Sequence, residues 1–120
     1  MPIYLDYSAT TPMDPAVFEA MRPYFVEKYA NPSSIHSLGR AIRDDLEKAR
    51  ETVAKSIGAE AHEIIFTASG SESDNMAIRG TAELFRDKGK HIITSSIEHK
   101  AVLESFKLLE KQGLDRKSVV

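Results

Sequence analysis

The stretch "FTASGSESDN", residues 66–75, lies between an apolar run and an amphipathic run. Its small residues continue to Ser71, and the side chains of Glu72, Asp74 and Asn75 follow directly. This pattern is typical of a turn that leads from a strand into a helix. Small residues at such a turn allow the backbone to approach a ligand closely, and that ligand is usually an anion.

Two interpretations of this turn are open. In the first, Gly70 permits a positive φ, and Ser71 offers its N–H and its hydroxyl to a phosphate at the positive end of the helix dipole. In the second, Ser71 is the N-cap of an ordinary helix, and Glu72 and Asp74 are favoured in the first turn by the same dipole. The turn matches neither the P-loop pattern nor the G-x-G-x-x-G pattern.

The hydrophobic periodicity around this turn predicts an α/β fold. Apolar runs of strand length occupy residues 63–67 and 91–95. Apolar residues at steps of three and four predict helices over residues 37–57, 71–87 and 99–112. A glycine follows each of these helices as its expected stop, namely Gly58, Gly89 and Gly113. Strands that alternate with helices predict parallel βαβ units, in which ligands bind at the carboxyl ends of the strands.

The N-terminal part of the chain predicts a short, interrupted helix. Asp14 and Pro15 have the residue types of an N-cap and a first helical position. Pro23 is expected to end or kink this helix. The segment "YANPSSIHSLGR", residues 29–40, then has the composition of a loop.

Composition limits the classes of function. The net charge of -2 gives no electrostatic reason to expect nucleic acid as a partner. No apolar run approaches the roughly 20 residues that a membrane span needs, and no signal peptide is recognised. Cysteine is absent, which excludes disulfides and a cysteine nucleophile within these 120 residues. The four histidines lack metal-ligand spacing, so no metal site is expected.

His99 follows the second predicted strand, at the start of a predicted helix. An imidazole at this place can stack on a flat aromatic cofactor or move protons near neutral pH, and it can equally be a capping or surface residue. Lys100 points about 100° away from His99 on a helix, so we expect it to be solvated. His36 has the same two interpretations, as a residue of a substrate loop or as a polar loop residue.

Four segments in register carry a family resemblance: "YLDYSATTP", "NPSSIHSLGR", "EIIFTASGSESDN" and "HIITSSIEHKAVL". Together they resemble the N-terminal portion of cysteine desulfurases, which are pyridoxal-phosphate-dependent enzymes of the class V aminotransferase superfamily. The resemblance covers residues 2–113. It implies the large domain of a fold type I transferase, with an N-terminal arm and helices at residues 1–60 and the start of the cofactor-binding domain at residues 61–120.

The resemblance also implies roles for particular residues. Gly70 and Ser71 match the positions that bind the phosphate of the cofactor, pyridoxal 5'-phosphate, although a threonine is usual where Ser71 stands. His99 matches the histidine that stacks on the pyridine ring and assists proton transfer. Four further residues match segments on the substrate side, namely Ala9, Thr10, Asn31 and His36.

By this resemblance the whole protein converts L-cysteine to L-alanine and transfers the sulfur as a persulfide, for iron–sulfur cluster and thio-cofactor assembly. A homodimer, a sulfur-acceptor or scaffold protein and a cytoplasmic location are also implied. The alternatives are another class V enzyme, such as a selenocysteine lyase, and a small non-catalytic α/β module that binds a phosphorylated ligand.

The resemblance has two departures. In the family, the cofactor-attaching lysine, the aspartate at the pyridine nitrogen and the sulfur-accepting cysteine lie beyond residue 120, so we expect this chain alone to be inactive. After Gly113 the family continues with an apolar strand. Asp115, Arg116 and Lys117 stand in this chain where a buried strand should start, and a foreign or frame-shifted terminus would account for them.

Overall fold

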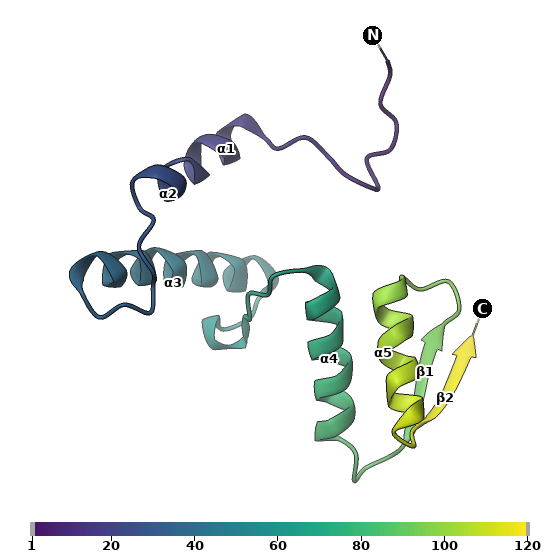
Figure 1. Ribbon diagram of the computed structural model, residues 1–120. Helices are drawn as coiled ribbons and strands as arrows, with labels where there is room; N and C mark the ends of the chain where they lie inside the picture. Colours follow the sequence, from purple (N-terminus) through teal and green to yellow (C-terminus); the bar gives the residue numbers. More distant parts are fainter. Residues whose placement is uncertain (1, 120) are drawn as a thin grey trace. The chain divides into compact units, whose positions relative to one another are not determined.

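A computed structural model describes residues 2–119 of the chain. These residues form two compact units, one that extends to Ile64 and one that begins at Ile65. Figure 1 labels the helices and strands in chain order. Each unit is described by itself below.

The first unit is helical. Its elements are α1 (Pro15–Met21), α2 (Pro23–Val26), α3 (Ser37–Ile57) and a single 3-10 turn, η1 (Ala61–Glu63). The carboxylate of Asp14 accepts the N–H of Ala16 at 2.7 Å, and Pro23 separates α1 from α2, so both predictions for this segment are confirmed. Gly58 ends α3 with a φ of 71°, as predicted. No helix within residues 2–119 has the length and apolar content to cross a membrane.

Polar side chains tie the segment around α2 to the middle of α3. The Tyr24 hydroxyl donates to Asp45 Oδ2 at 3.0 Å, and Lys28 Nζ donates to the same oxygen at 2.9 Å. The hydrogen bond from Lys28, followed by the one from Tyr24, holds the pKa of the Asp45 carboxyl below its usual value. The same bond and the negative charge of Asp45 raise the pKa of Lys28.

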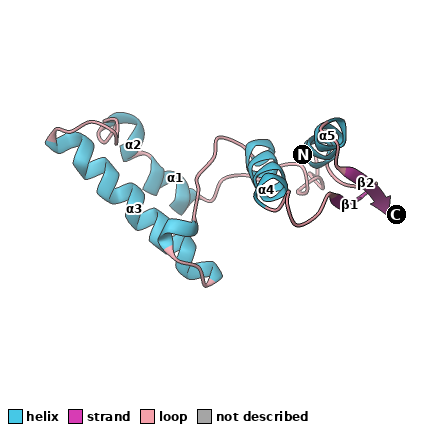
Figure 2. Cartoon of the chain, turned by 90° about the horizontal axis from the view of Figure 1, so that it is seen from below, coloured by secondary structure: helices cyan, strands magenta, loops and turns pink. Residues whose placement is uncertain are grey.

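The second unit contains α4 (Gly70–Leu84), β1 (His91–Ser95), α5 (Lys100–Lys111) and β2 (Asp115–Val119). The two strands pair in parallel, in a register that runs from His91 opposite Asp115 to Ser95 opposite Val119. Helix α5 connects the strands and packs on both, and α4 packs against α5. Figure 2 shows this order from α4 through α5 to the strands. The predicted α/β class with parallel strands is therefore confirmed.

The core of the second unit lies where α5 meets the strands. Leu109 of α5 is 4% exposed, and Thr94 of β1 and Leu114 are similarly buried. Ser105 is buried as well, and its hydroxyl donates to the carbonyl oxygen of Ala101 at 2.9 Å, so this polar group is satisfied. This packing fixes α5, and with it the turn that precedes α5.

The strand predicted at residues 63–67 is wrong. Within the described residues, Glu63 belongs to η1, and residues 64–67 are in no sheet. Ile64 has the extended backbone of a strand, with a φ of -93° and a ψ of 124°, but a strand needs the hydrogen bonds of a neighbour. Ile65 is 64% exposed, so this apolar segment is extended without being covered.

Strand β2 forms in spite of its charged residues. Asp115 Oδ2 lies 2.7 Å from His91 Nδ1, and Arg116 Nε donates to Glu110 Oε2 at 3.1 Å. Charged side chains are common on exposed edge strands, where they remain in water and leave the backbone free to pair. The charges of Asp115, Arg116 and Lys117 do not fit a buried strand, but they are compatible with the exposed edge strand that β2 forms.

Candidate functional site

The turn before α4 is fixed by reciprocal hydrogen bonds. The side chain of Ser69 accepts the N–H of Glu72 at 3.2 Å, so Ser69 is the N-cap. The Glu72 carboxylate in turn accepts the N–H of Ala68 at 2.7 Å. The interpretation in which Ser71 is the N-cap is therefore wrong, because Ser71 is the second residue of the helix.

Two hydroxyls close the same turn. The hydroxyl oxygens of Thr67 and Ser73 lie 2.6 Å apart. Both also lie within hydrogen-bond distance of the Ser69 carbonyl oxygen, at 3.1 Å and 3.3 Å. The backbone before α4 is therefore held in one conformation by side chains on both of its sides.

The first two backbone N–H groups of α4 have no acceptor within the described part of the chain. They belong to Gly70 and Ser71, and the exposed Ser71 hydroxyl has no partner there either. A Cβ at Gly70 would meet nothing within 4 Å, so the space beside Gly70 is open. Open space, two N–H donors, a hydroxyl and the positive end of a helix dipole together suit a phosphate group.

The positive φ expected of Gly70 is wrong. Gly70 is the first residue of α4, and positive φ values occur elsewhere in the described residues, at Gly58 and Gly113. The glycine is therefore not needed for a left-handed turn. Its small size matters only for what approaches the helix start.

His99 is the N-cap of α5. Its Nδ1 accepts the N–H of Ala101 at 3.2 Å, and the residue is exposed. Because Nδ1 accepts a hydrogen bond, a neutral His99 ring carries its proton on Nε2. The capping role and a role toward a ligand are compatible, since capping uses one ring nitrogen. Lys100 is the exposed first residue of α5, as expected for a solvated lysine.

The starts of α4 and α5 lie at the same end of the second unit, together with the carboxyl end of β1 (Figure 1). Helix α4 also packs against α5, so the two helices form one packed pair that starts at this end. The structure therefore brings the turn with Gly70 and Ser71 to the same end of this unit as His99.

Two of the substrate-side candidates, Ala9 and Thr10, lie in the arm of the first unit. Their N–H groups donate to the carbonyl oxygen of Asp6 at 3.1 Å and 3.4 Å. The hydroxyl of Tyr4 lies 3.0 Å from the carbonyl oxygen of Thr10. Both candidates are exposed and are part of a hydrogen-bonded turn.

The other two, Asn31 and His36, bound the loop that precedes α3. Asn31 Oδ1 accepts the N–H of Ser33 at 2.8 Å, and the Asn31 carbonyl oxygen accepts the N–H of Ser34 at 3.0 Å. His36 is the N-cap of α3, with Nδ1 accepting the N–H of Gly39 at 3.2 Å. Sequence reasoning identified both residues as candidates but did not predict their local hydrogen bonds. The cap at His36 was missed because histidine is an uncommon N-cap residue.

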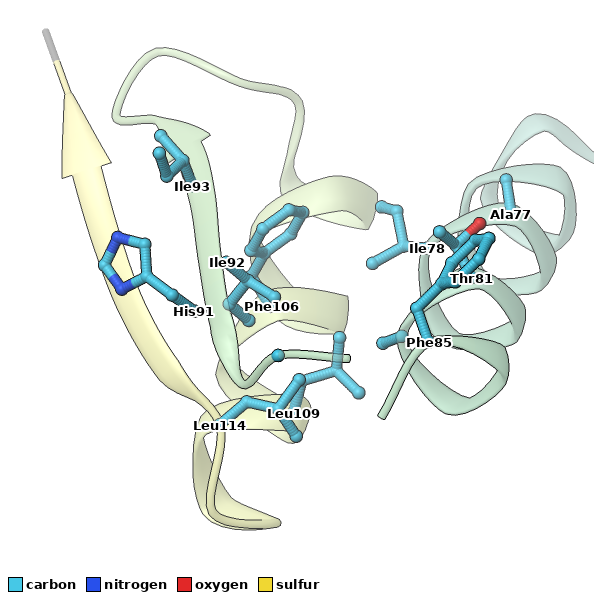
Figure 3. Close-up of a pocket in the computed structure, with 12 residues that line it drawn as sticks. Ala77, Ile78, Thr81, Phe85, His91, Ile92, Ile93, Phe106, Leu109 and Leu114 are labelled. Carbon is cyan, nitrogen blue, oxygen red and sulfur yellow. The ribbon is translucent and has the colours of Figure 1, made fainter. Parts of the chain in front are cut away.

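A separate groove of about 450 Å³ lies in the second unit. Figure 3 shows that Ile78 of α4 and Phe85, which directly follows α4, face Phe106 and Leu109 of α5 across it. None of the site residues predicted from the sequence lines this groove. Helical periodicity predicted the apolar faces of the two helices, but it contains no information on the gap between them.

Comparisons with known proteins agree with this description. A family model described as "Aminotransferase class-V" matches residues 3–117. The cysteine desulfurase IscS of Dictyoglomus turgidum is 58% identical over 113 residues, which are 94% of this chain and 29% of that protein. A solved structure of a NifS-like protein has a TM-score of 0.91 and 44% identity, over 99% of this chain and 33% of that one. A structure of SspA in complex with cysteine has a TM-score of 0.87 and 41% identity, over 97% of this chain and 33% of that one.

The chain thus spans about 29% of the length of the desulfurase it matches. Enzymes of this family depend on pyridoxal 5'-phosphate. The phosphate-type turn at the start of α4 fits such a cofactor, and the family match extends over nearly all residues. The chain belongs to the aminotransferase class-V family.

Proposed function

We propose that this chain is the N-terminal part of a pyridoxal-phosphate-dependent cysteine desulfurase, which converts L-cysteine to L-alanine and passes the sulfur on as a persulfide. The observation that carries the proposal is the pair of N–H groups without an acceptor at Gly70 and Ser71, at the same end of the unit as His99. The 58% identity to a desulfurase supports the choice of reaction.

Gly70 and Ser71 are proposed to hold the phosphate of the cofactor. Both N–H groups lie in the first turn of α4 without an acceptor among residues 2–119, and the Ser71 hydroxyl adds a third donor. The helix dipole favours the dianion at this position. The hydrogen bonds of Ser69 and Glu72 fix the turn in advance, so the donors need little rearrangement when the phosphate binds.

His99 is proposed to lie against the pyridine ring and to exchange a proton through Nε2. The cofactor, when bound, supplies the electron sink for bond changes at the α and β carbons of the amino acid. The bond from the Ala101 N–H to Nδ1 fixes the orientation of the ring and its neutral tautomer. Nε2 is then the nitrogen that remains for proton transfer.

Ala9, Thr10, Asn31 and His36 are proposed to lie on the substrate side. All four are exposed and belong to turns or loops with internal hydrogen bonds. Preformed loops of this kind are frequent in binding sites, because they position polar groups at a small entropic cost. L-cysteine is the proposed substrate.

Other parts of the proposal concern the whole protein. They are a homodimer, a sulfur-acceptor or scaffold protein as partner, a cytoplasmic location, and a use in iron–sulfur cluster and thio-cofactor assembly. The division into an arm with helices at residues 1–60 and the start of the cofactor-binding domain at residues 61–120 also stays a prediction.

A reconstituted enzyme tests the proposed function. In it, residues 2–113 of this chain are joined to the remainder of the Dictyoglomus turgidum relative. We expect this protein to bind pyridoxal 5'-phosphate and to form alanine and sulfide from L-cysteine in the presence of a reductant. The 120-residue chain by itself should give no turnover above the free-cofactor background, because it contains no cysteine to act as the thiol nucleophile. A reconstituted enzyme that forms no alanine, beside an active unmodified relative, would refute the proposal.

A further inference from the structure

The loop of residues 31–36 is clamped onto the beginning of α3. Arg40 Nη1 donates to the carbonyl oxygen of Ile35 at 2.6 Å. Arg43 Nε, almost one turn further along α3, donates to the carbonyl oxygen of Pro32 at 2.9 Å. Two cationic side chains of the helix therefore bind two backbone carbonyl groups of the loop, and such charge-assisted hydrogen bonds are stronger than neutral ones.

Gly39 forms the third part of this clamp. It is buried, and a Cβ at this residue would lie 2.5 Å from the carbonyl oxygen of Ser34 and 2.8 Å from that of Asn31. Both obstacles are backbone atoms, so no flexible side chain can move aside to make room. The N–H of Gly39 also donates to His36 Nδ1 at 3.2 Å. Gly39 thus contacts the loop at its beginning, its middle and its end.

We infer that Gly39 is a positioning residue of the proposed desulfurase: with Arg40 and Arg43 it fixes the loop from Asn31 to His36 on α3. This inference rests on the proposed function, which places the loop on the substrate side. The same N–H sets the tautomer of His36, because a neutral ring that accepts at Nδ1 carries its proton on Nε2. The loop therefore presents a defined hydrogen-bond donor at His36.

The hydrogen bonds within the loop explain why its attachment to α3 affects the orientation of Asn31. Asn31 Oδ1 accepts the N–H of Ser33, which orients the side chain, and no described residue accepts a hydrogen bond from its amide nitrogen, so this nitrogen can donate to a ligand. The direction of that nitrogen follows the backbone of the loop. In enzymes generally, a misplacement of a positioned group by about 1 Å can reduce the rate about 100-fold. A helix-interior glycine is unfavourable for helix formation compared with alanine, and here the close approach of the loop requires it.

The test compares Gly39→Ala with Gly80→Ala. Both glycines lie inside helices, but a Cβ at Gly80 would meet nothing within 4 Å. In the 120-residue chain, amide hydrogen exchange of residues 33–36 and the ring 15N shifts of His36 are measured for both variants. We expect Gly39→Ala to speed the exchange at least tenfold and to remove the Nδ1-acceptor signature of His36. Gly80→Ala should change neither.

Arg43→Ala provides a second variant that keeps the helix and all the glycines. Arg43 is exposed, so its removal leaves the fold intact, and faster amide exchange at residues 33–36 is again expected. If Gly39→Ala does not fold, the result with Arg43→Ala decides whether the loop is clamped onto α3. Unchanged exchange in Arg43→Ala, together with an unchanged His36 signature in any folded Gly39→Ala protein, would overturn the clamp.

The reconstituted enzyme then separates a positioning role from a merely structural one. We expect Gly39→Ala and Arg43→Ala to raise the KM for L-cysteine about tenfold while cofactor retention stays unchanged. A released loop with an unchanged KM would overturn the positioning role. An inactive reconstituted enzyme with the native sequence would refute the proposed function instead, and the exchange and 15N measurements would still decide on the clamp.

Discussion

At the scale of single residues, Ser71 has a hydroxyl and an N–H that no described residue uses. A hydrogen bond from this hydroxyl to a charged phosphate contributes roughly 1.5–3 kcal/mol, which corresponds to about 10- to 150-fold in affinity. We therefore expect Ser71→Ala to weaken the binding of pyridoxal 5'-phosphate by the reconstituted enzyme by this factor. The measurement is cofactor absorbance after dialysis over a range of cofactor concentrations.

Ser71→Thr is the matched control, because it keeps the hydroxyl and has the residue usual in the family. It should retain the cofactor as well as the native sequence does. The cap itself is not touched by either variant, since Ser69 provides it. Equal cofactor retention in Ser71→Ala and Ser71→Thr would show that this hydroxyl does not contact the phosphate.

His99 combines a cap with a proposed catalytic role, and two substitutions separate them. His99→Asn keeps a side-chain acceptor for the Ala101 N–H but has no imidazole. His99→Ala has neither, and the lost cap costs about 1 kcal/mol of stability. In the reconstituted enzyme we expect both variants to lose most alanine formation, whereas only His99→Ala lowers the Tm. If His99→Asn forms alanine at the native rate, the imidazole is not needed for the reaction and His99 acts only as the N-cap of α5.

Sequence reasoning located the turn before α4, but the serine that it considered as the cap, Ser71, was the wrong one. Serine has the same capping preference at 69 and 71, so residue type alone does not distinguish them. The spacing does: Ser69 and Glu72 have the Ser-x-x-Glu spacing of a capping box, although the Glu72 carboxylate bonds to the N–H of Ala68. This signal was present in the sequence and, if used, identifies Ser69.

At the scale of secondary-structure elements, the cluster of Tyr24, Lys28 and Asp45 connects the segment around α2 to α3. Because Lys28 lowers the pKa of Asp45, this carboxylate stabilises the fold above the ordinary pKa of aspartate, and its contribution is lost as the pH falls through the lowered pKa. The raised pKa of Lys28 has the opposite sign: its contribution is present below the ordinary pKa of lysine and is lost as the pH rises through the raised value.

Asp45→Asn is therefore expected to destabilise the chain at neutral pH, by an amount that disappears at a pH below the lowered pKa of Asp45. The measurement is the urea midpoint of the native sequence and the variant across acid and neutral pH. Asp44→Asn is the control, since Asp44 makes no ion pair among residues 2–119. If the urea midpoints of the native sequence and Asp45→Asn differ by the same amount down to the lowest pH, the stabilisation does not come from the Asp45 ion pair.

The elements that the sequence predicted correctly are those whose signals are local. Helix α3 was predicted to the residue, because its apolar stripe and Gly58 define both the face and the end. Helix α4 begins one residue earlier and ends at Leu84 instead of residue 87, since a turn at Phe85 comes before Gly89. The pairing of β1 with β2 was missed, because the neighbour of a strand is determined by non-local contacts that periodicity does not contain.

At the scale of the whole molecule, few hydrophobic side chains are covered. The buried ones in the described residues are Ala54, Leu109 and Leu114. Large apolar residues on the first two helices remain exposed, namely Val17, Phe18, Phe25 and, just after them, Tyr29. Exposed apolar surface on this scale is the mark of an interface or of a tendency to aggregate.

We therefore expect the 120-residue chain by itself to bind a hydrophobic dye and to self-associate at micromolar concentration. The reconstituted enzyme should bind less dye per chain, because the remainder of the relative supplies the surfaces that cover this part. Phe25 is 71% exposed, so Phe25→Ser should reduce dye binding without loss of helix content. Dye fluorescence and sedimentation of the three proteins make the comparison. If the 120-residue chain is monodisperse and binds no dye, its apolar faces cover one another in solution. That result would refute the prediction that the remainder of the relative covers them.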